Sequence, residues 1–305
     1  MPSGRRGVSG LYVKLVLVAA IWGAMYIAGR TVAQLLPHFT SATLRFIVAS
    51  TILIALSYAR EGGLTPLDHK RFAAALALGF TGVFAFNAFF FAALERIPAG
   101  RGALIMALNP VVTALGARLA FNERVAAARW LGITVALAGT AVVLTRGELP
   151  TASTGAFGTG DLLMFGSVLA WVSYTLVGRS VLKAMSPLGA TTWAALFGTG
   201  MLGACAVFEQ PWSAIAALPA KGWWSILFLG SFGTVVAFLW YYQGVQRLGP
   251  SRAAVFVNFV PVFGVAFAAL VLDEPVLGST IVGGVLVIAG VALTNRGARG
   301  RAARR

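Results

Sequence analysis

The chain repeats part of its own sequence, and the repeat runs through strongly apolar segments. Adding 151 to the residue number carries the stretch 79–141 onto a similar stretch in the second half. The residues that agree are Gly79, Gly82, Arg96, Arg101, Pro110, Glu123, Gly132 and Gly139 with Gly230, Gly233, Arg247, Arg252, Pro261, Glu274, Gly283 and Gly290. Internal repeats inside a bilayer are typical of secondary transporters, whose substrate site forms between the halves. The sequence therefore predicts a duplicated membrane protein.

The composition excludes a soluble domain. Of 305 residues, 58% are hydrophobic and only 11% are charged, so lipid must be the main solvent. The one cysteine, Cys205, has no intramolecular partner, which excludes disulfides and cysteine-rich metal sites. The net charge of +15 is typical of basic membrane flanks, and we expect the lipid bilayer rather than nucleic acid as the partner.

The apolar segments predict ten membrane-spanning helices. A spanning helix needs about 20 mainly apolar residues. Windows of that size fall near 11–33, 40–59, 72–94, 99–121, 126–145, 159–182, 187–208, 222–246, 250–271 and 276–295. The domains are a first five-helix repeat over 1–145, a linker over 146–160 that is rich in Gly, Thr, Ser and Pro, and a second five-helix repeat over 161–305.

The distribution of basic residues predicts the orientation. With both termini in the cytoplasm, the outer side holds only Arg30, Arg45, Arg96, Arg101, Arg146 and Lys221, which satisfies the positive-inside rule. Because each half has an odd number of spans, the second enters the membrane upside down. The predicted fold is an all-α integral membrane protein of the plasma (bacterial inner) membrane, with ten transmembrane helices in a 5+5 inverted-topology repeat around a central cavity.

Several short motifs occur in the order of a known family. They are Ala-Ala-Ile-Trp-Gly at 19–23, Leu-Arg-Phe at 44–46, Asn-Pro at 109–110 and Asn-Glu at 122–123. With the duplication, they resemble the EamA-type branch of the drug/metabolite transporter superfamily. That resemblance implies a basket of helices in which the fourth and ninth face one another across a cavity and the fifth and tenth are peripheral. It also implies export of amino acids, aromatic ones included, or of other small metabolites.

The first two helices of each half follow a different offset. There the best alignment adds 149, which carries Trp22, Gly29 and Arg30 onto Trp171, Gly178 and Arg179. Trp22 and Tyr26 then share one helix face, as do Trp171 and Tyr174. Such ring pairs can stack on an apolar or aromatic substrate and hold its ammonium group, or they can serve as packing and interfacial belts.

Amides and prolines form the second candidate set. Asn87, Asn109 and Asn258 lie in apolar spans, where each must bond something, either a neighbouring helix or a substrate in a wet cavity. Pro110 and Pro261 fall near the middle of the fourth and ninth predicted spans, where each removes a backbone donor. We expect them to act as hinges, although proline is also simply tolerated where neighbours satisfy the freed carbonyl.

Arg45 lies just inside the outer end of the second span, deep enough to be costly and shallow enough to snorkel. It is a candidate for contacting a substrate carboxylate. A structural contact with backbone carbonyls or Glu95 explains it equally well.

The acidic residues and the two histidines all map to loops or span ends. Since proton-driven pumps usually hold a carboxylate or histidine along the pathway, we expect facilitated transport or coupling through an end residue. No phosphate loop, catalytic set or metal cluster is recognisable, so we expect no cofactor, no metal and no catalytic residues. A membrane-embedded enzyme and a non-transporting scaffold or sensor are the alternatives to a transporter. Beyond a small-molecule substrate and lipid, we expect a monomer or weak homodimer.

The orientation is directly testable. Green fluorescent protein fused to either terminus should fluoresce, because both ends are predicted to be cytoplasmic. Alkaline phosphatase fused after Ser153, in the linker, should be active, because five spans carry that segment to the outer side. Termini on opposite faces would contradict the predicted ten spans.

Overall fold

The described part of the chain is helical, with no strand. The computed structural model describes residues 3–109, 111–113, 115–116, 127–144, 158–182, 184–248, 256–257 and 259–302. Within them, six helices are long and apolar enough to cross a membrane: Gly10–Ala33, His38–Glu61, His69–Arg96, Thr159–Gly178, Pro187–Phe208 and Ala220–Tyr241. They confirm the predicted first, second, third, sixth, seventh and eighth spans.

The other predicted spans are described in part. Trp130–Val143, Val260–Leu272 and Gly278–Gly290 are apolar helices of 10–17 residues. The fourth predicted span begins as α5 (Ala99–Met106). The ten-span count and most of the linker over 146–160 therefore extend outside the described residues.

The helices group into two compact units. Unit 1 comprises Met1–Ile27, Pro98–Gly158 and Val236–Arg305, and unit 2 comprises Ala28–Ile97 and Thr159–Val235. Unit 1 holds α1 (Ser3–Ala33) up to Ile27, α5, α7 (Ala127–Leu144), α12 (Ala237–Leu248), α14 (Val260–Leu272) and α15 (Gly278–Ala302). Unit 2 holds α2 (His38–Glu61), α3 (His69–Leu78), η1 (Gly79–Ala85), α4 (Phe86–Arg96), α8 (Thr159–Val181), α9 (Pro187–Phe208), α10 (Trp212–Ala216), α11 (Ala220–Phe228) and nearly all of η2 (Leu229–Val236).

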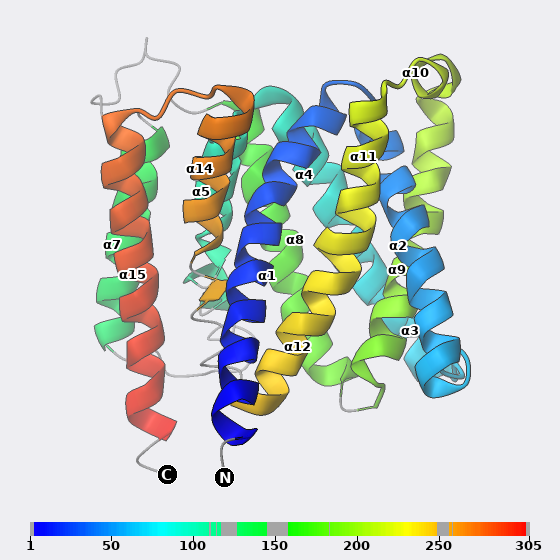
Figure 1. Ribbon diagram of the computed structural model, residues 1–305, viewed down its shortest axis with the longest axis horizontal. Coiled ribbons are helices and arrows are strands. Elements are labelled where there is room, and N and C mark those ends of the chain that lie inside the picture. The colour runs from blue at the N-terminus through cyan, green and yellow to red at the C-terminus, as the bar shows by residue number, and fades with distance from the viewer. Residues whose placement is uncertain are drawn as a thin grey trace. The chain divides into compact units, whose positions relative to one another are not determined.

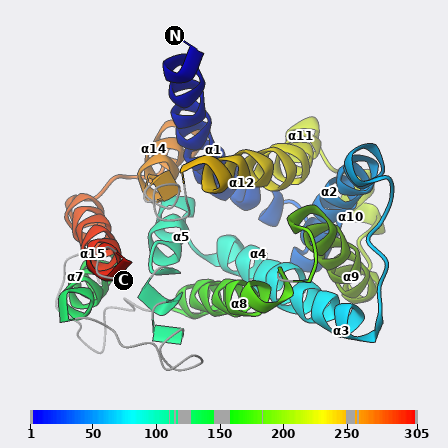
Figure 2. The same cartoon turned by 90° about the horizontal axis from the view of Figure 1, so that it is seen from below.

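In unit 1, α7 and α15 lie side by side (Figures 1 and 2). Their backbones are in close contact at glycine residues. A Cβ at Gly139 would come within 2.6 Å of the Gly283 carbonyl oxygen, and one at Gly290 within 2.5 Å of the Gly132 oxygen. The 151 offset pairs Gly132 with Gly283 and Gly139 with Gly290, so the two contacts are equivalents of one another. Absence of side chains lets the backbones approach closely, which is how apolar helices associate in lipid.

In unit 2, α2 and α9 are joined by a row of polar contacts. The Ser50 and Thr199 hydroxyls lie 3.1 Å apart, and those of Ser57 and Thr192 lie 3.0 Å apart. The 149 offset carries Ser50 onto Thr199 itself. Hydroxyl pairs of this kind hold helices together where neither water nor the hydrophobic effect contributes.

Two further crossings in unit 2 use glycine in the same way. A Cβ at Gly79 would meet the Ala194 carbonyl oxygen and the Phe197 Cβ, each at 2.9 Å. A Cβ at Gly230 would meet the Arg45 carbonyl oxygen and the Val48 Cβ, each at 2.7 Å. The offsets carry Gly79 onto Gly230, Arg45 onto Ala194 and Val48 onto Phe197, so offset-related residues make offset-related contacts.

Both of these glycines lie in π-helical segments. η1 occupies Gly79–Ala85 between α3 and α4, and η2 occupies Leu229–Val236 between α11 and α12. The 151 offset carries Gly79 and Gly82 of η1 onto Gly230 and Gly233 of η2. Single π segments inside α-helices are rare and concentrate at functional positions.

The glycine contact of α7 and α15 predicts a specific cost of substitution. Gly139→Ala should destabilise the protein by about 1–3 kcal/mol, because the new methyl group would press on backbone of α15. Gly200→Ala is the matched control: a Cβ there meets nothing within 4 Å, so it should be neutral or slightly stabilising. Thermal unfolding of both variants in detergent checks this, and equal midpoints would contradict the packing.

Candidate functional site

Arg45 lies buried inside unit 2, with 3% of its surface exposed. Its Nη1 donates to Asn87 Oδ1 at 2.9 Å, and its Nη2 donates to Thr234 Oγ1 at 3.2 Å. Its buried Nε has no hydrogen-bond partner among the residues that the structure describes. Of the two structural contacts considered from the sequence, Glu95 instead pairs with Arg96 at 2.7 Å.

The two acceptors of Arg45 are held in place by the π segments. Asn87 Nδ2 donates to the Val83 carbonyl of η1 at 2.7 Å, and the Thr234 hydroxyl donates to the Leu229 carbonyl of η2 at 3.0 Å. Each side chain thus donates to a carbonyl of its own helix, and its oxygen accepts from the guanidinium. Asn87 was predicted as a site residue, whereas Thr234 was missed because one threonine in an apolar span carries no signal in sequence.

One predicted aromatic pair lies in unit 2, close to this cluster along α4. The Trp171 ring is 5.4 Å from the Tyr174 ring and 5.3 Å from that of Phe86, the residue before Asn87. Tyr174 packs over Gly82 of η1, where a Cβ would clash with its ring. The sequence predicted the Trp171 and Tyr174 pair but missed Phe86, one phenylalanine among many.

The other predicted pair lies in unit 1. The half-buried Trp22 contacts Phe238 edge-on at 5.8 Å and Tyr241 at 5.4 Å between ring centroids. Tyr26 is buried, with 6% of its surface exposed, beside Gly264 of α14. The two predicted pairs therefore lie in different units, and in unit 1 Trp22 contacts two other rings.

The remaining predicted residues are described unevenly. Asn109 is half-buried and accepts a hydrogen bond from the Thr113 hydroxyl at 3.2 Å. Pro261 is buried in the first turn of α14, where a missing N–H costs the helix nothing. Pro110 and Asn258 lie outside the described residues, and the hinge role stays a prediction.

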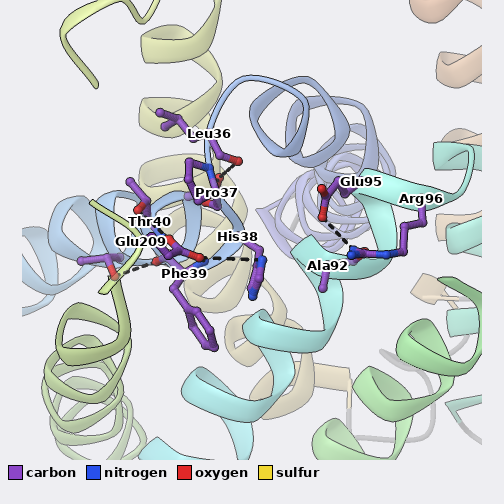
Figure 3. A network of polar contacts seen from close by, with 11 residues as sticks. Leu36, Pro37, His38, Phe39, Thr40, Ala92, Glu95, Arg96 and Glu209 are labelled. Atoms are coloured by element: carbon purple, nitrogen blue, oxygen red, sulfur yellow. Dashed lines mark hydrogen bonds and ion pairs between the residues drawn. The ribbon is translucent and has the colours of Figure 1, made fainter. Parts of the chain in front are cut away.

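Glu209 ties the end of α9 to the start of α2 (Figure 3). It accepts from the Phe39 and Thr40 backbone N–H groups at 3.0 and 2.8 Å and from the Thr40 hydroxyl at 2.7 Å, and His38 Nδ1 lies 3.7 Å away. An anion at a helix N-terminus satisfies free donors and favours the positive end of the helix dipole. Sequence alone placed Glu209 merely at a span end.

Other helix starts are held by glutamates too. In unit 1, Glu274 accepts from the Ala99 and Gly100 N–H groups of α5 at 2.9 and 3.2 Å. In unit 2, Glu61 accepts from the Ser186 hydroxyl at 3.1 Å, and Ser186 caps α9. Among the described residues, no group of three or more His, Cys, Asp or Glu could hold a metal ion.

A family comparison decides what kind of protein carries these clusters. The model of the EamA-like transporter family matches residues 10–145 and again residues 158–296. The chain belongs to the EamA-like transporter family. It is therefore a multi-pass membrane transporter of the drug/metabolite transporter superfamily, and the resemblance inferred from its motifs is confirmed. Family and relatives point to transport rather than catalysis.

Two bacterial proteins and one plant protein are similar to this chain over most of its length. The chain is 32% identical over 282 residues to the uncharacterized transporter YyaM of Bacillus subtilis, covering 92% of each. It is 26% identical over 285 residues to the uncharacterized transporter YetK of the same organism, covering 93% of this chain and 86% of YetK. It is also 23% identical over 301 residues to a WAT1-related chloroplastic protein of Arabidopsis thaliana, covering 96% of this chain and 71% of that protein.

A solved structure shares the fold. A chain described as a crystal structure of a protein matches with a TM-score of 0.65 at 19% identity, covering 94% of this chain and 97% of that one. At this identity the likeness bears on the fold alone. The EamA-like fold is thus shared with proteins of strongly diverged sequence.

The Glu209 contacts predict a stability difference between two glutamates at helix ends. Glu209→Ala should destabilise the protein by about 1–3 kcal/mol, because three hydrogen bonds to a carboxylate are lost at a helix start. Glu95→Ala is the control, since its exposed pair with Arg96 contributes about 1 kcal/mol at most. Thermal unfolding should separate them; equal midpoints would show that Glu209 does not secure α2.

Proposed function

We propose that the protein exports small amphipathic metabolites, amino acids first among them, by alternating access. Its ten helices form two five-helix repeats of opposite orientation, in a bacterial inner membrane with both termini cytoplasmic. Substrate binds in a central cavity between the repeats. The only partners that this function requires are the substrate and the surrounding lipid.

The duplication supports alternating access. The family model matches the chain twice. Offset-related residues also make offset-related contacts, as at Gly79 with Ala194 and at Gly230 with Arg45. Two similar bundles of opposite orientation can exchange conformations, which opens the site first to one side and then to the other.

One observation carries the substrate class: consecutive residues of α4 connect an aromatic cluster to a cation. Phe86 contacts the Trp171 ring, and the next residue, Asn87, accepts from Arg45. An amphipathic molecule needs both kinds of surface, a ring platform for its apolar part and polar groups for its ends. Amino acids are small molecules that combine an apolar side chain with charged polar ends.

Each candidate residue has a role in this proposal. Trp22, Tyr26, Trp171 and Tyr174 cradle the apolar body and hold an ammonium group against their rings. Asn87, Asn109 and Asn258 meet the polar ends. Pro110 and Pro261 permit rocking of the fourth and ninth spans.

Transport can be measured directly. Proteoliposomes containing the purified protein, loaded with one unlabelled amino acid, should take up the same labelled amino acid by exchange. Trp171→Ala should lower that exchange by about 10-fold, because ring stacking is lost at the platform. Trp212→Ala, an exposed tryptophan of α10, is the control and should exchange like the wild type. Uptake equal to that of empty vesicles across all amino acids would reject the amino-acid assignment.

A further inference from the structure

Arg45 is a buried cation whose described partners are all neutral. Asn87 and Thr234 supply its two hydrogen bonds, and among the described residues no carboxylate lies within ion-pair distance of it. Within the described part of the chain, its Nε has no hydrogen-bond partner. A buried charge is stable only when it is paired, and hydrogen bonds donated to neutral acceptors leave the net charge of the guanidinium uncompensated. The Phe46 ring lies 5.2 Å from Arg45 Cζ in a cation–π contact, but no described group supplies a compensating negative charge.

The equivalent crossing, of η1 with α9, shows that the fold does not require this cluster. The offsets carry Arg45 onto Ala194, and they carry Val83 and Asn87 onto Thr234 and Phe238. The helix crossing at Ala194 nevertheless has the same backbone contacts with Gly79 as the crossing at Arg45 has with Gly230. In that crossing, Ala194 takes the position of Arg45, and Val83 takes the position of Thr234. A cation in only one of two equivalent crossings points to binding rather than to folding.

From these observations we propose that Arg45 is the binding residue for a single carboxylate on the transported substrate, with Asn87 and Thr234 holding the guanidinium ready. The proposal rests on the proposed function and narrows its substrate class to monocarboxylates, amino acids included. The planar guanidinium presents Nε–H beside an Nη–H, the arrangement that a carboxylate accepts with both oxygens.

The charge of the site favours a carboxylate over a phosphate group. The other Lys and Arg residues described in unit 2 lie in the first or last turn of a helix, whereas Arg45 lies two turns into α2. One cation balances one negative charge, and a doubly charged phosphate would retain a net negative charge in apolar surroundings. On binding, one carboxylate oxygen accepts from the Nε–H and the other from the neighbouring Nη–H, and the uncompensated charge is neutralised.

Matched ligands separate the carboxylate from the rest of the molecule. Purified protein in detergent is heated with L-phenylalanine, L-phenylalaninamide, 3-phenylpropionate or inorganic phosphate, and with the same carboxylate and amide forms of leucine and alanine. Carboxylates should raise the thermal midpoint of the wild type, and the amides and phosphate should not. The apparent Kd of a carboxylate should be at least about 10-fold lower than that of its amide, the size expected for a hydrogen-bonded charge pair.

Variants of Arg45 test the site, and one of them reproduces residues of the equivalent crossing. Arg45→Ala with Thr234→Val installs two of the residues found at the equivalent crossing, Ala194 and Val83, so the double variant should fold and elute as the wild type does, while its carboxylate preference falls to within about twofold. Arg45→Lys retains the charge but loses the planar fork, and should weaken carboxylate binding by about 10-fold. Arg30→Gln is the control: Arg30 donates to the Leu94 and Ile97 carbonyls, so its loss should leave the preference intact.

Each result decides the proposal. Equal stabilisation by amides, stabilisation by phosphate alone, no stabilisation by any carboxylate, or an unchanged preference in the double variant would overturn it. If the double variant does not fold, an Arg45→Lys protein that binds like the wild type would overturn it instead. If 3-phenylpropionate binds through Arg45 while proteoliposomes exchange no amino acid, the carboxylate site stands and the amino-acid assignment fails.

Discussion

Close backbone contact at glycine is the interaction on which both units depend. Lipid is as apolar as the side chains that face it, so helices gain little by burying leucine against one another and must associate through tight packing and hydrogen bonds. Gly139 and Gly283 bring α7 and α15 together, and Gly79 and Gly230 bring η1 onto α9 and η2 onto α2. Each contact places one helix backbone against another, where a single methyl group would separate them.

Hydrogen bonds between the helices add to the stabilisation that the glycine contacts provide. In unit 2, the Ser50 and Thr199 pair and the Ser57 and Thr192 pair lie along the α2 and α9 contact. Glu209 secures the start of α2 from the end of α9, and Glu61 reaches the cap of α9 from the end of α2. The two helices are therefore joined at both ends as well as along their length, and Arg45 lies on one of them.

Sequence predicted six of the spans that the described residues contain, because their signal is composition, which lipid enforces on every residue of a helix. It also predicted the family, and it singled out Asn87, which lies against Arg45. It did not predict the π segments, because a single extra residue in a helical turn leaves no mark on hydropathy. Thr234, Phe86 and Glu209 were missed for a related reason: their importance comes from a distant partner, Arg45, Trp171 or Thr40, and one sequence does not pair residues so far apart. Pro261, predicted near mid-span, lies in the first turn of α14, and part of the predicted span before it lies outside the described residues.

The π segments also tie the buried charge to helix geometry. A residue that moves one step around an α-helix turns by about 100°. If η2 shifted along its helix by one residue, the Thr234 hydroxyl would rotate off Arg45, and a shift of η1 would likewise disturb the Val83 carbonyl that orients Asn87. The hydrogen bonds of the guanidinium thus depend on the helical winding of both η1 and η2. A ligand that neutralises the guanidinium would therefore change the relative stability of the π-helical and α-helical windings of these two segments.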